Sequence, residues 1–453
     1  MIENSGNQFK EKIKQQRNSS ARSIKKLLRQ RWFVVAIALI LTGLGASITS
    51  ISFKTGIYFI NNWRLEILEQ FSPFIVLPLF GLVGGGVSGF LIKNFAPAAK
   101  GSGVSQIMGF LRHKSVPMNL KVGLIKLISG IIAIGSGFPL GPEGPSVQMG
   151  GSVAWQMAKW LKAPVAFRRV IVAAGGGAGI AAVFSAPLGG FVYAIEELLN
   201  SARPVILLLV IVTTFIADSS ALIIQATGLN PKAGGFDFQS GFSIEPTFEI
   251  DFSFLPTDFI YLVLLGIVIG VFAELYSNYV LMMQNLGKKW YKNKFVLKMS
   301  ICGLVLGFIY SFLPDTFHNL DQLQKIIATQ DTDIGLAILA VFILFITTGL
   351  AAASGAPGGL FYPMLTLGGA IGLIVGSLIP EHAPSTYIFA GMGAFVAGCS
   401  RTPITAMFLA FALTKDLIIM KPVLISCITS FLIARSFNQE SIYERQIKIE
   451  VDN

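Results

Sequence analysis

Residues 135–154 read GSGFPLGPEGPSVQMGGSVA, and residues 353–372 read ASGAPGGLFYPMLTLGGAIG. At an offset of 218 residues the two stretches share a Ser-Gly pair near their start and a Gly-Gly pair further on. A second match follows in the same order at an offset of 216, between AGGGAGIAAVFSAPL at 174–188 and AGMGAFVAGCSRTPI at 390–404. Two ordered matches predict a chain of two related halves, whose facing segments share one substrate site.

The composition is that of a membrane protein. Only 13% of the 453 residues are charged and the mean hydropathy is +0.67, whereas about 25% of a typical soluble domain is charged. Residues 33–53 carry no charge over 21 positions, enough for a helix to span a hydrocarbon core of roughly 30 Å. Residues 334–380 contain no Asp, Glu, Lys, Arg or His. We therefore expect an all-α, polytopic membrane protein.

The apolar segments are interrupted by many of the 47 glycines and 20 prolines. Candidate membrane segments lie near 33–53, 73–93, 122–140, 144–158, 170–195, 204–226, 257–280, 298–313, 334–353, 360–380, 387–411 and 418–436. Several are too short or too glycine-rich for one simple crossing. Backbone left unpaired at such breaks is tolerated only where protein or a water-filled cavity surrounds it. Broken helices that meet near the membrane midplane are a common way to build a transport site.

The ends of the chain are polar. Nine Lys and Arg residues lie within 1–32 beside two glutamates, which by the positive-inside rule predicts a cytoplasmic N-terminus. A basic tail also occurs in nucleic-acid-binding proteins, but beside a membrane span it is more often a topology signal, and we expect no nucleic acid. The predicted organisation is a basic cytoplasmic segment 1–32, a membrane transport domain 33–436 (first repeat about 33–226, second repeat about 257–436) and a short cytoplasmic segment 437–453.

Cysteine and histidine give no sign of a metal or a cofactor. The three cysteines lie in apolar stretches and the three histidines are scattered. No spacing among them is typical of a metal site or of a disulfide framework. An intramembrane enzyme would need a nucleophile–base pair or metal ligands within the membrane, and the sequence offers no such set. We expect neither a metal, a cofactor nor an enzymatic activity.

Two short motifs in the first half indicate anion chemistry. GSGVS at 101–105 places Ser102 between Gly101 and Gly103, ahead of a predicted helix start. Helix N-termini hold anions through free N–H groups and a partial positive charge. On this motif alone an ordinary glycine–serine turn is the more frequent explanation.

GPEGPSVQ at 141–148 is more informative. Glu143 is the only charged residue between Lys126 and Lys159. An ionisable side chain within a membrane span costs roughly 2.5–3.5 kcal/mol on insertion scales, so it is functional by default. Gly144 leaves room beside it. A carboxylate at a helix start can occupy an anion site as a tethered substitute for the ion, and protonation would release that site. The alternative is a carboxylate satisfied by local backbone.

The corresponding stretch of the second half is GAPGGLFYP at 355–363, which carries no charge. Any contact with an anion must come from backbone N–H groups around Leu360 and Phe361. Alone, the stretch is only a glycine-rich break in a helix.

In combination these motifs resemble the CLC family of chloride channels and chloride/proton exchangers. CLC proteins have, in order, a GSGIP-type motif, G(K/R)EGP, APLxGxxxxxEE and GxFxP. This chain has GSGVS, GPEGP, APLGGFVYAIEE at 186–197 and GLFYP. The similarity extends from about residue 30 to residue 445. It implies a homodimer in a lipid bilayer, with two inverted halves and one chloride and proton pathway per subunit.

The resemblance also implies roles for single residues. Ser102, the N–H groups of Leu360 and Phe361, and the hydroxyl of Tyr443 would bind the central chloride, with Gly101, Gly103, Gly144 and Lys126 in support. Glu143 would be the gate and the external proton site. Glu197 would be the internal proton site of an exchanger, whereas most channels of the family have a neutral residue there. A solvated carboxylate at a helix end is the alternative for this acidic pair, and it suits Glu196 better.

The chain departs from the family pattern at three positions. Pro142 stands where Lys or Arg is usual, so one positive charge near the external entrance is missing. Ser105 and Gln106 stand where Pro and Glu are common, beside the expected anion contact. Ser102 in place of proline favours chloride over nitrate, by resemblance to the plant members of the family.

We therefore predict a chloride/proton antiporter in the inner membrane of a prokaryotic cell. A passive chloride channel with the same fold is the nearest alternative, and Glu197 argues against it because a channel needs no internal proton acceptor. A cation-coupled symporter would need more carboxylates or carbonyl cages at membrane depth than the isolated Glu143 supplies.

Overall fold

The computed structural model describes residues 2–201, 203–226, 252, 254–290, 294–330, 332–379 and 383–450, with side-chain surroundings from residue 33 onward. Within these ranges the structure is helical, and its one extended pairing is an antiparallel bridge between Gly141 and Gly359. The all-α prediction is therefore confirmed. The basic side chains of 1–32 lie outside the part of the chain whose surroundings are described.

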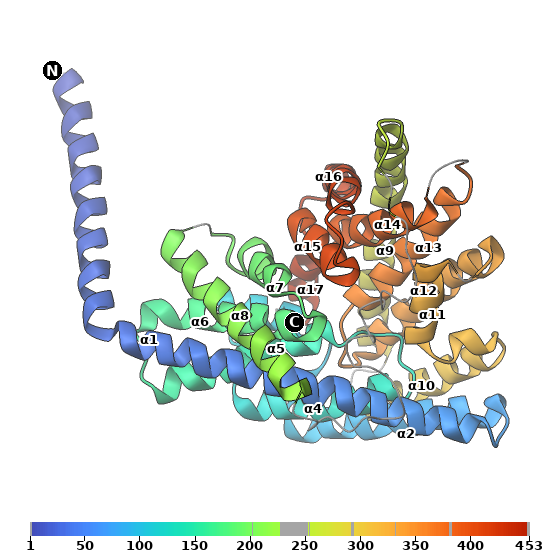
Figure 1. Cartoon of the computed structure of the whole chain (residues 1–453). Helices are drawn as coiled ribbons and strands as arrows, with labels where there is room; N and C mark the ends of the chain where they lie inside the picture. Colours follow the sequence, from blue (N-terminus) through green and yellow to red (C-terminus); the bar gives the residue numbers. More distant parts are fainter. Residues whose placement is uncertain are drawn as a thin grey trace.

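The order of the helices along the chain can be followed in Figure 1. The first half contains α1 (Ile2–Leu68), α2 (Pro73–Phe95), α3 (Val104–Leu111), α4 (Leu120–Gly135), α5 (Glu143–Trp160), α6 (Val165–Phe184), α7 (Pro187–Tyr193), the π-helical turn η2 (Ala194–Leu199) and α8 (Pro204–Ala226). The second half contains α9 (Asp258–Trp290), α10 (Phe295–Ser311), α11 (Leu320–Thr329), α12 (Ile334–Ser354), α13 (Phe361–Gly376), α14 (Pro384–Ser400), α15 (Pro403–Thr414), α16 (Met420–Phe437) and α17 (Ile442–Glu450). Short 3₁₀ turns lie at Pro97–Ala99 and Asp315–Phe317.

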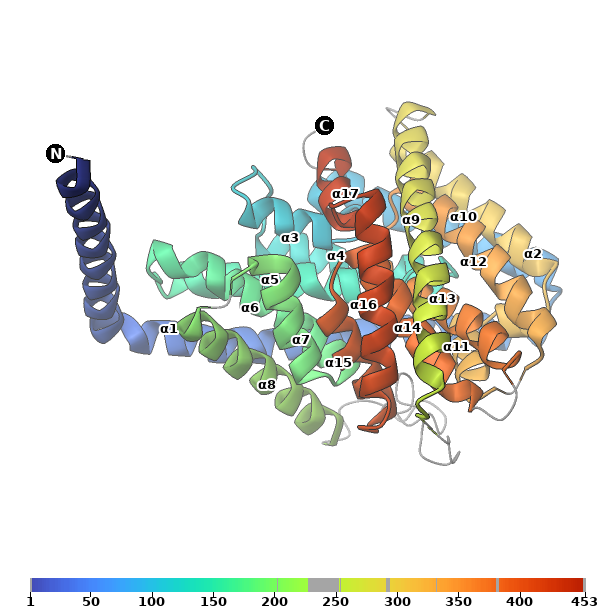
Figure 2. The same cartoon turned by 90° about the horizontal axis from the view of Figure 1, so that it is seen from above.

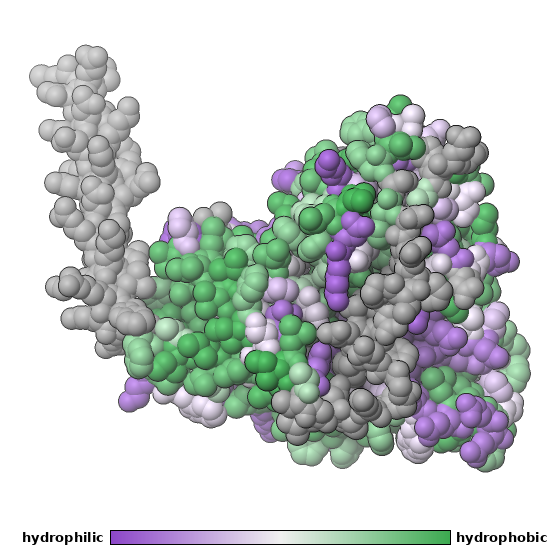
Figure 3. All heavy atoms as spheres, in the orientation of Figure 1, coloured by the Kyte–Doolittle hydropathy of each residue, from purple (hydrophilic) through white to green (hydrophobic). Residues whose placement is uncertain are grey.

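Seven helices of the described chain are long and apolar enough to cross a membrane. They are Phe33–Leu68, Pro73–Phe95, Val165–Phe184, Pro204–Ala226, Asp258–Lys289, Ile334–Ser354 and Met420–Phe437. Apolar side chains form a broad surface where α6 and α8 lie (Figure 3), and Leu208 and Ile223 of α8 are each 63% exposed. Such a surface suits lipid or another apolar partner and not water. The protein is a multi-pass membrane protein.

The two matching sequence blocks form equivalent helix pairs. In the first half α5 packs on α6, and in the second half α13 packs on α14. A Cβ on Gly150 would lie 2.1 Å from the carbonyl oxygen of Gly175, and one on Gly368 would lie 2.3 Å from that of Gly391. Both helix pairs thus need glycine at the same place, where the backbones touch. The repeated glycines of the sequence have a packing cause.

Two expected membrane segments, 170–195 and 387–411, are each broken once. In the first, Ser185 adopts a left-handed conformation with φ of 50° after α6, and Pro187 begins α7. In the second, Arg401 has φ of 62° after α14, and Pro403 begins α15. Proline is tolerated in a first helical turn, where its missing N–H costs no bond, so the chain stops and restarts at these positions. Each break creates a helix N-terminus inside the protein.

The C-terminal helix α17 returns to the interior. It packs against α3 and α9, and Figure 2 shows it beside α16 and α9. Arg445 of α17 donates to Glu274 of α9 at 2.9 Å, and Arg401 at the α14–α15 break donates to the same carboxylate at 2.7 Å. All three side chains are about nine-tenths buried or more. The Glu274 carboxylate therefore links α17 to α9 and to the α14–α15 break.

Candidate functional site

The Glu143 carboxylate lies at the meeting point of the two halves. Glu143 is the first residue of α5 and is buried. Its Oε1 accepts a hydrogen bond of 2.9 Å from the backbone N–H of Tyr362, in the first turn of α13. The negative charge thus occupies the N-terminus of a helix from the opposite half, a position suited to an anion.

A small backbone bridge fixes this geometry. The N–H of Gly141 donates to the carbonyl of Gly359 at 2.9 Å, and the N–H of Gly359 returns a bond of 2.7 Å to Gly141. The two glycine-rich breaks therefore hold each other in register. Oε2 of Glu143 is buried and has no hydrogen-bond partner among the described residues. One oxygen of Glu143 is thus bound to the start of α13, and the other meets no donor from the described residues.

The GSGVS loop packs directly on the start of α5. Ser102 is buried just ahead of α3. A Cβ on Gly103 would lie 2.5 Å from the carbonyl of Gly144, and one on Gly144 would lie 2.3 Å from the carbonyl of Ser102. Gly101 has φ of 71° and donates to the carbonyl of Gly355 in the second half at 3.0 Å. The three glycines allow the serine loop to lie against both halves.

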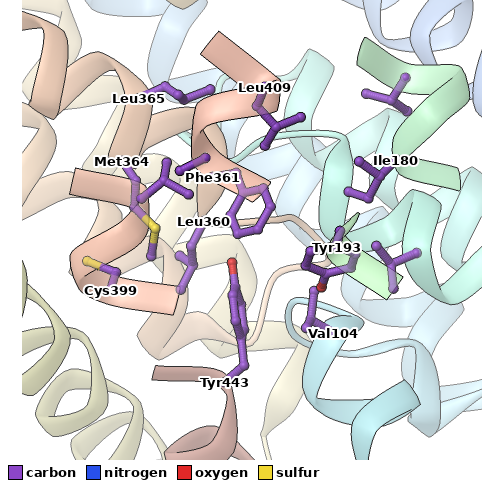
Figure 4. Packing of buried hydrophobic residues seen from close by; sticks show 14 of the residues in the cluster. Val104, Ile180, Tyr193, Leu360, Phe361, Met364, Leu365, Cys399, Leu409 and Tyr443 are labelled. Carbon is purple, nitrogen blue, oxygen red and sulfur yellow. The ribbon is translucent and has the colours of Figure 1, made fainter. Parts of the chain in front are cut away.

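Aromatic rings surround the centre of the protein. The rings of Tyr443 and Tyr193 each lie 5.8 Å from the ring of Phe361, in edge-on contact. Figure 4 shows the Tyr443 hydroxyl pointing toward Phe361 and Leu360, with Tyr193 approaching from the other side. Both tyrosine hydroxyls are buried without a hydrogen-bond partner among the described residues. Buried hydroxyls are nearly always bonded, so these donors indicate a ligand position between α13, α17 and α7.

Lys126 is fully buried on α4 and supports the serine loop from behind. Its Nζ donates to the carbonyl of Ala99 at 3.0 Å and to that of Gly101 at 2.5 Å. The ammonium is directed at the loop backbone. Its place in the structure is that of a positioning residue for the loop.

The two neighbouring glutamates at the end of the APLGGFVYAIEE stretch have different surroundings. Glu197 is buried, and its Oε1 accepts a bond of 3.1 Å from the Ser441 hydroxyl. Glu196 accepts from the N–H of Thr405 at 2.9 Å and from its hydroxyl at 2.7 Å. Glu196 is therefore a half-buried cap for the start of α15. Both lie in the π-helical turn η2, a form often found at functional sites.

The sequence model of the family described as "Voltage gated chloride channel" matches residues 84–435. The chain belongs to this family.

Individual CLC proteins agree along nearly the whole chain. The protein is 28% identical over 440 residues to the H(+)/Cl(-) exchange transporter ClcA of Vibrio parahaemolyticus, covering 93% of this chain and 91% of the relative. It is 29% identical over 430 residues to ClcA of Salmonella paratyphi A, covering 91% and 86%. A slow cyanobacterial Cl-/H+ antiporter of known structure is 26% identical with a TM-score of 0.81, covering 93% of this chain and 98% of that one. A eukaryotic CLC transporter shares the fold at 23% identity, with a TM-score of 0.76.

Against the CLC pattern, the structure adds three residues that sequence reasoning missed. Tyr362 supplies a backbone N–H to Glu143, one residue beyond the pair named from the sequence. Gln446 of α17 is fully buried, and the Ser102 hydroxyl donates to its Oε1 at 3.5 Å. Its Nε2 has no partner among the described residues. The sequence signal that could have identified Gln446 is its polar side chain one helical turn beyond Tyr443.

The third addition is Glu450, which explains two departures from the CLC pattern. Its carboxylate accepts from the hydroxyl of Ser105 and from the amide of Gln106 at 2.9 Å. Gln284 of α9 donates to the other oxygen at 3.3 Å. The two residues that depart from the pattern, Ser105 and Gln106, therefore both donate to one carboxylate of α17.

Proposed function

We propose that this protein exchanges chloride for protons across the membrane. Relatives that cover about nine-tenths of the chain are H(+)/Cl(-) exchange transporters. The observation that carries the proposal is the Glu143 carboxylate at the N-terminus of α13. One of its oxygens accepts the backbone N–H of Tyr362, and the other has no hydrogen-bond partner among the described residues. A side chain held where an anion would sit competes with that anion, and it also carries a proton. Chloride binding and proton transfer, the two parts of the exchange, therefore both depend on Glu143.

The gate operates by competition. Ionised Glu143 accepts the N–H of Tyr362 at the start of α13 and excludes chloride from this helix N-terminus. Protonation removes the charge and weakens this charge-assisted bond, so the side chain leaves and chloride takes the helix N-terminus. Chloride departure lets the glutamate ionise and return. One proton site thus alternates with one anion site, and neither can be filled without affecting the other.

The central chloride lies, on this proposal, among Ser102, Tyr443 and the start of α13. The donors are the two hydroxyls and the N–H groups around Leu360 and Phe361. We add the amide of Gln446, because its Nε2 is buried without a partner and its Oε1 already faces Ser102. Neutral donors suit a chloride site, because they stabilise the ion without binding it so strongly that it cannot leave. Serine at position 102 favours chloride over nitrate.

Glu197 is the proposed internal proton site. It lies one helical turn from Tyr193, whose ring packs on Phe361 at the start of α13 and whose buried hydroxyl has no partner among the described residues. A proton can therefore be loaded at one carboxylate and delivered to the other beside the chloride pathway, not through it. The neighbouring Glu196 is occupied as a helix cap and is not part of this route.

The remaining features follow the family resemblance. We propose a homodimer with one pathway per subunit, an N-terminus in the cytoplasm and a place in the inner membrane of a prokaryotic cell. A passive chloride channel is the competing function, since it would use the same gate. An intramembrane enzyme would need a nucleophile–base pair, and a cation-coupled symporter would need further carboxylates. Neither set is among the residues that we place around Glu143.

Simultaneous measurement of chloride and proton flux in reconstituted vesicles tests the proposal. An imposed chloride gradient should drive protons against their own gradient at a fixed chloride-to-proton ratio. Chloride movement that collapses the gradient without moving protons would identify a channel.

A further inference from the structure

A partly open cavity, the outer cavity, lies between α1 and the start of α13. Its volume is about 90 Å³, room for several water molecules. Pro142 and Tyr362 are in its wall, and these residues flank or bind Glu143. The other walls come from α1 and from the start of α11, at Asp321. The cavity therefore borders both the residue that precedes Glu143 and the residue that bonds its carboxylate.

Two basic side chains and one acidic side chain line this outer cavity. Lys54 of α1 is half-buried, and its Nζ donates to the carbonyl of Val183 at 2.9 Å. Arg64, three turns further along α1, is buried. Its Nη2 donates to Asn61 and to the carbonyl of His318, each at 2.7 Å, and its Nε has no partner among the described residues. Asp321 lines the same cavity as both cations.

The basic residues lie where the chain lacks its usual positive charge. In the CLC pattern a Lys or Arg stands at position 142, and here Pro142 lines the same cavity as Lys54 and Arg64. A single negative side chain opposes two positive ones, so the field in the cavity is favourable to an anion. In surroundings with less water than bulk solvent this attraction is strengthened.

We propose that the outer cavity is a recruiting site for a small monovalent anion, with chloride as its occupant, in which Lys54 and Arg64 of α1 replace the charge missing at position 142. The site deepens the proposed function by naming where chloride waits before it displaces the Glu143 carboxylate. Asp321 limits the affinity, since an anion held too tightly would not move on to the gate. On the proposed topology this cavity faces the external side.

The test uses the full chain in reconstituted vesicles and measures the chloride concentration for half-maximal uptake. Lys54→Gln keeps a polar side chain and removes the charge. The loss of one partly screened attraction should raise the half-saturating concentration roughly three- to tenfold, with little change in maximal rate. Asp321→Asn should lower it, an opposite effect that a misfolded protein would not give. Lys325→Gln is the matched control, because Lys325 is exposed on α11 and is not in the cavity wall.

A relocated charge makes the test more specific. In the double variant Lys54→Gln with Pro142→Arg, the positive charge returns to the cavity from its other wall, and the half-saturating concentration should return toward the original value. Unchanged chloride dependence in Lys54→Gln overturns the proposal, as does an equal change in Lys325→Gln. Chloride uptake is measured here without reference to protons. If the protein moves chloride without protons, the antiport proposal fails, but the effect of Lys54→Gln on the half-saturating chloride concentration can still be measured.

Discussion

The backbone N–H of Tyr362 donates a 2.9 Å hydrogen bond to the carboxylate of Glu143, although the two residues are 219 positions apart. Each half of the protein thus completes the other. The first half supplies the charge, and the second supplies the helix N-terminus that holds it. Because neither half can form this contact alone, the gate depends on the packing of α5 against α13.

Replacement of the gate tests its two proposed tasks together. Glu143→Gln has the shape of the protonated side chain and cannot ionise, so it should leave chloride flux within about an order of magnitude of the original while proton flux falls to background. The chloride flux should also lose its pH dependence. Proton transport driven by a chloride gradient in this variant would show that another residue carries the proton.

Selectivity is expected to depend on the hydroxyl of Ser102. Ser102→Pro removes a donor to a charged ligand, worth about 1.5 kcal/mol, which corresponds to roughly a tenfold loss of chloride preference over nitrate. Competition between the two anions for uptake gives the ratio. Ser105→Ala is the control, because its hydroxyl bonds Glu450 and not the ligand position. An equal chloride-to-nitrate ratio in both variants would remove Ser102 from this role.

The internal proton site separates an exchanger from a channel. Glu197→Gln keeps the shape of the side chain and its bond from Ser441 but removes the titrating group, so chloride flux should persist and proton flux should be lost. A membrane potential, worth about 2.3 kcal/mol per charge per 100 mV, would then drive chloride alone. Glu196→Gln should retain both fluxes, since an amide oxygen can still cap α15. Exchange at the original ratio in Glu197→Gln would place the internal proton site elsewhere.

Gln446 should contribute to chloride affinity. Gln446→Leu is similar in size and removes the amide, so the half-saturating chloride concentration should rise several-fold, as expected for one lost hydrogen bond of about 1 kcal/mol. Gln284→Leu removes another buried amide, one that bonds Glu450. If chloride affinity falls equally in both, the effect comes from the packing of α17 and not from contact with the ion.

Stability should depend on Glu274, which holds two buried arginines. Glu274→Ala leaves the side chains of Arg401 and Arg445 without their carboxylate, and loss of one member of a buried ion pair costs about 3–5 kcal/mol. Thermal unfolding in detergent should shift strongly downward. Glu440→Ala breaks an exposed pair with Lys448 and should cost less than about 1 kcal/mol. Similar unfolding temperatures for the two variants would contradict the structural role given to Glu274.

Much of the architecture could be predicted from the sequence because its signals are local. Apolar runs indicate membrane helices from length and composition alone, and repeated glycines indicate where two helices touch. The isolation of Glu143 in an apolar stretch made it a candidate before any fold was known. The helix break at Ser185 was less clear, because the residues on both sides of it are apolar and a left-handed residue ahead of proline has only a weak sequence signal.

By itself, then, the sequence determined the membrane class, the two related halves and the isolated Glu143 that we propose as the gate. Only the tertiary structure decided which groups contact the Glu143 carboxylate. Two adjacent glutamates look alike in the sequence, yet Glu196 reaches the start of α15 while Glu197 lies buried against Ser441. Gln446 faces Ser102 only because α17 folds back into the centre of the protein. Such contacts join residues hundreds of positions apart, and no local pattern of hydropathy or spacing records them.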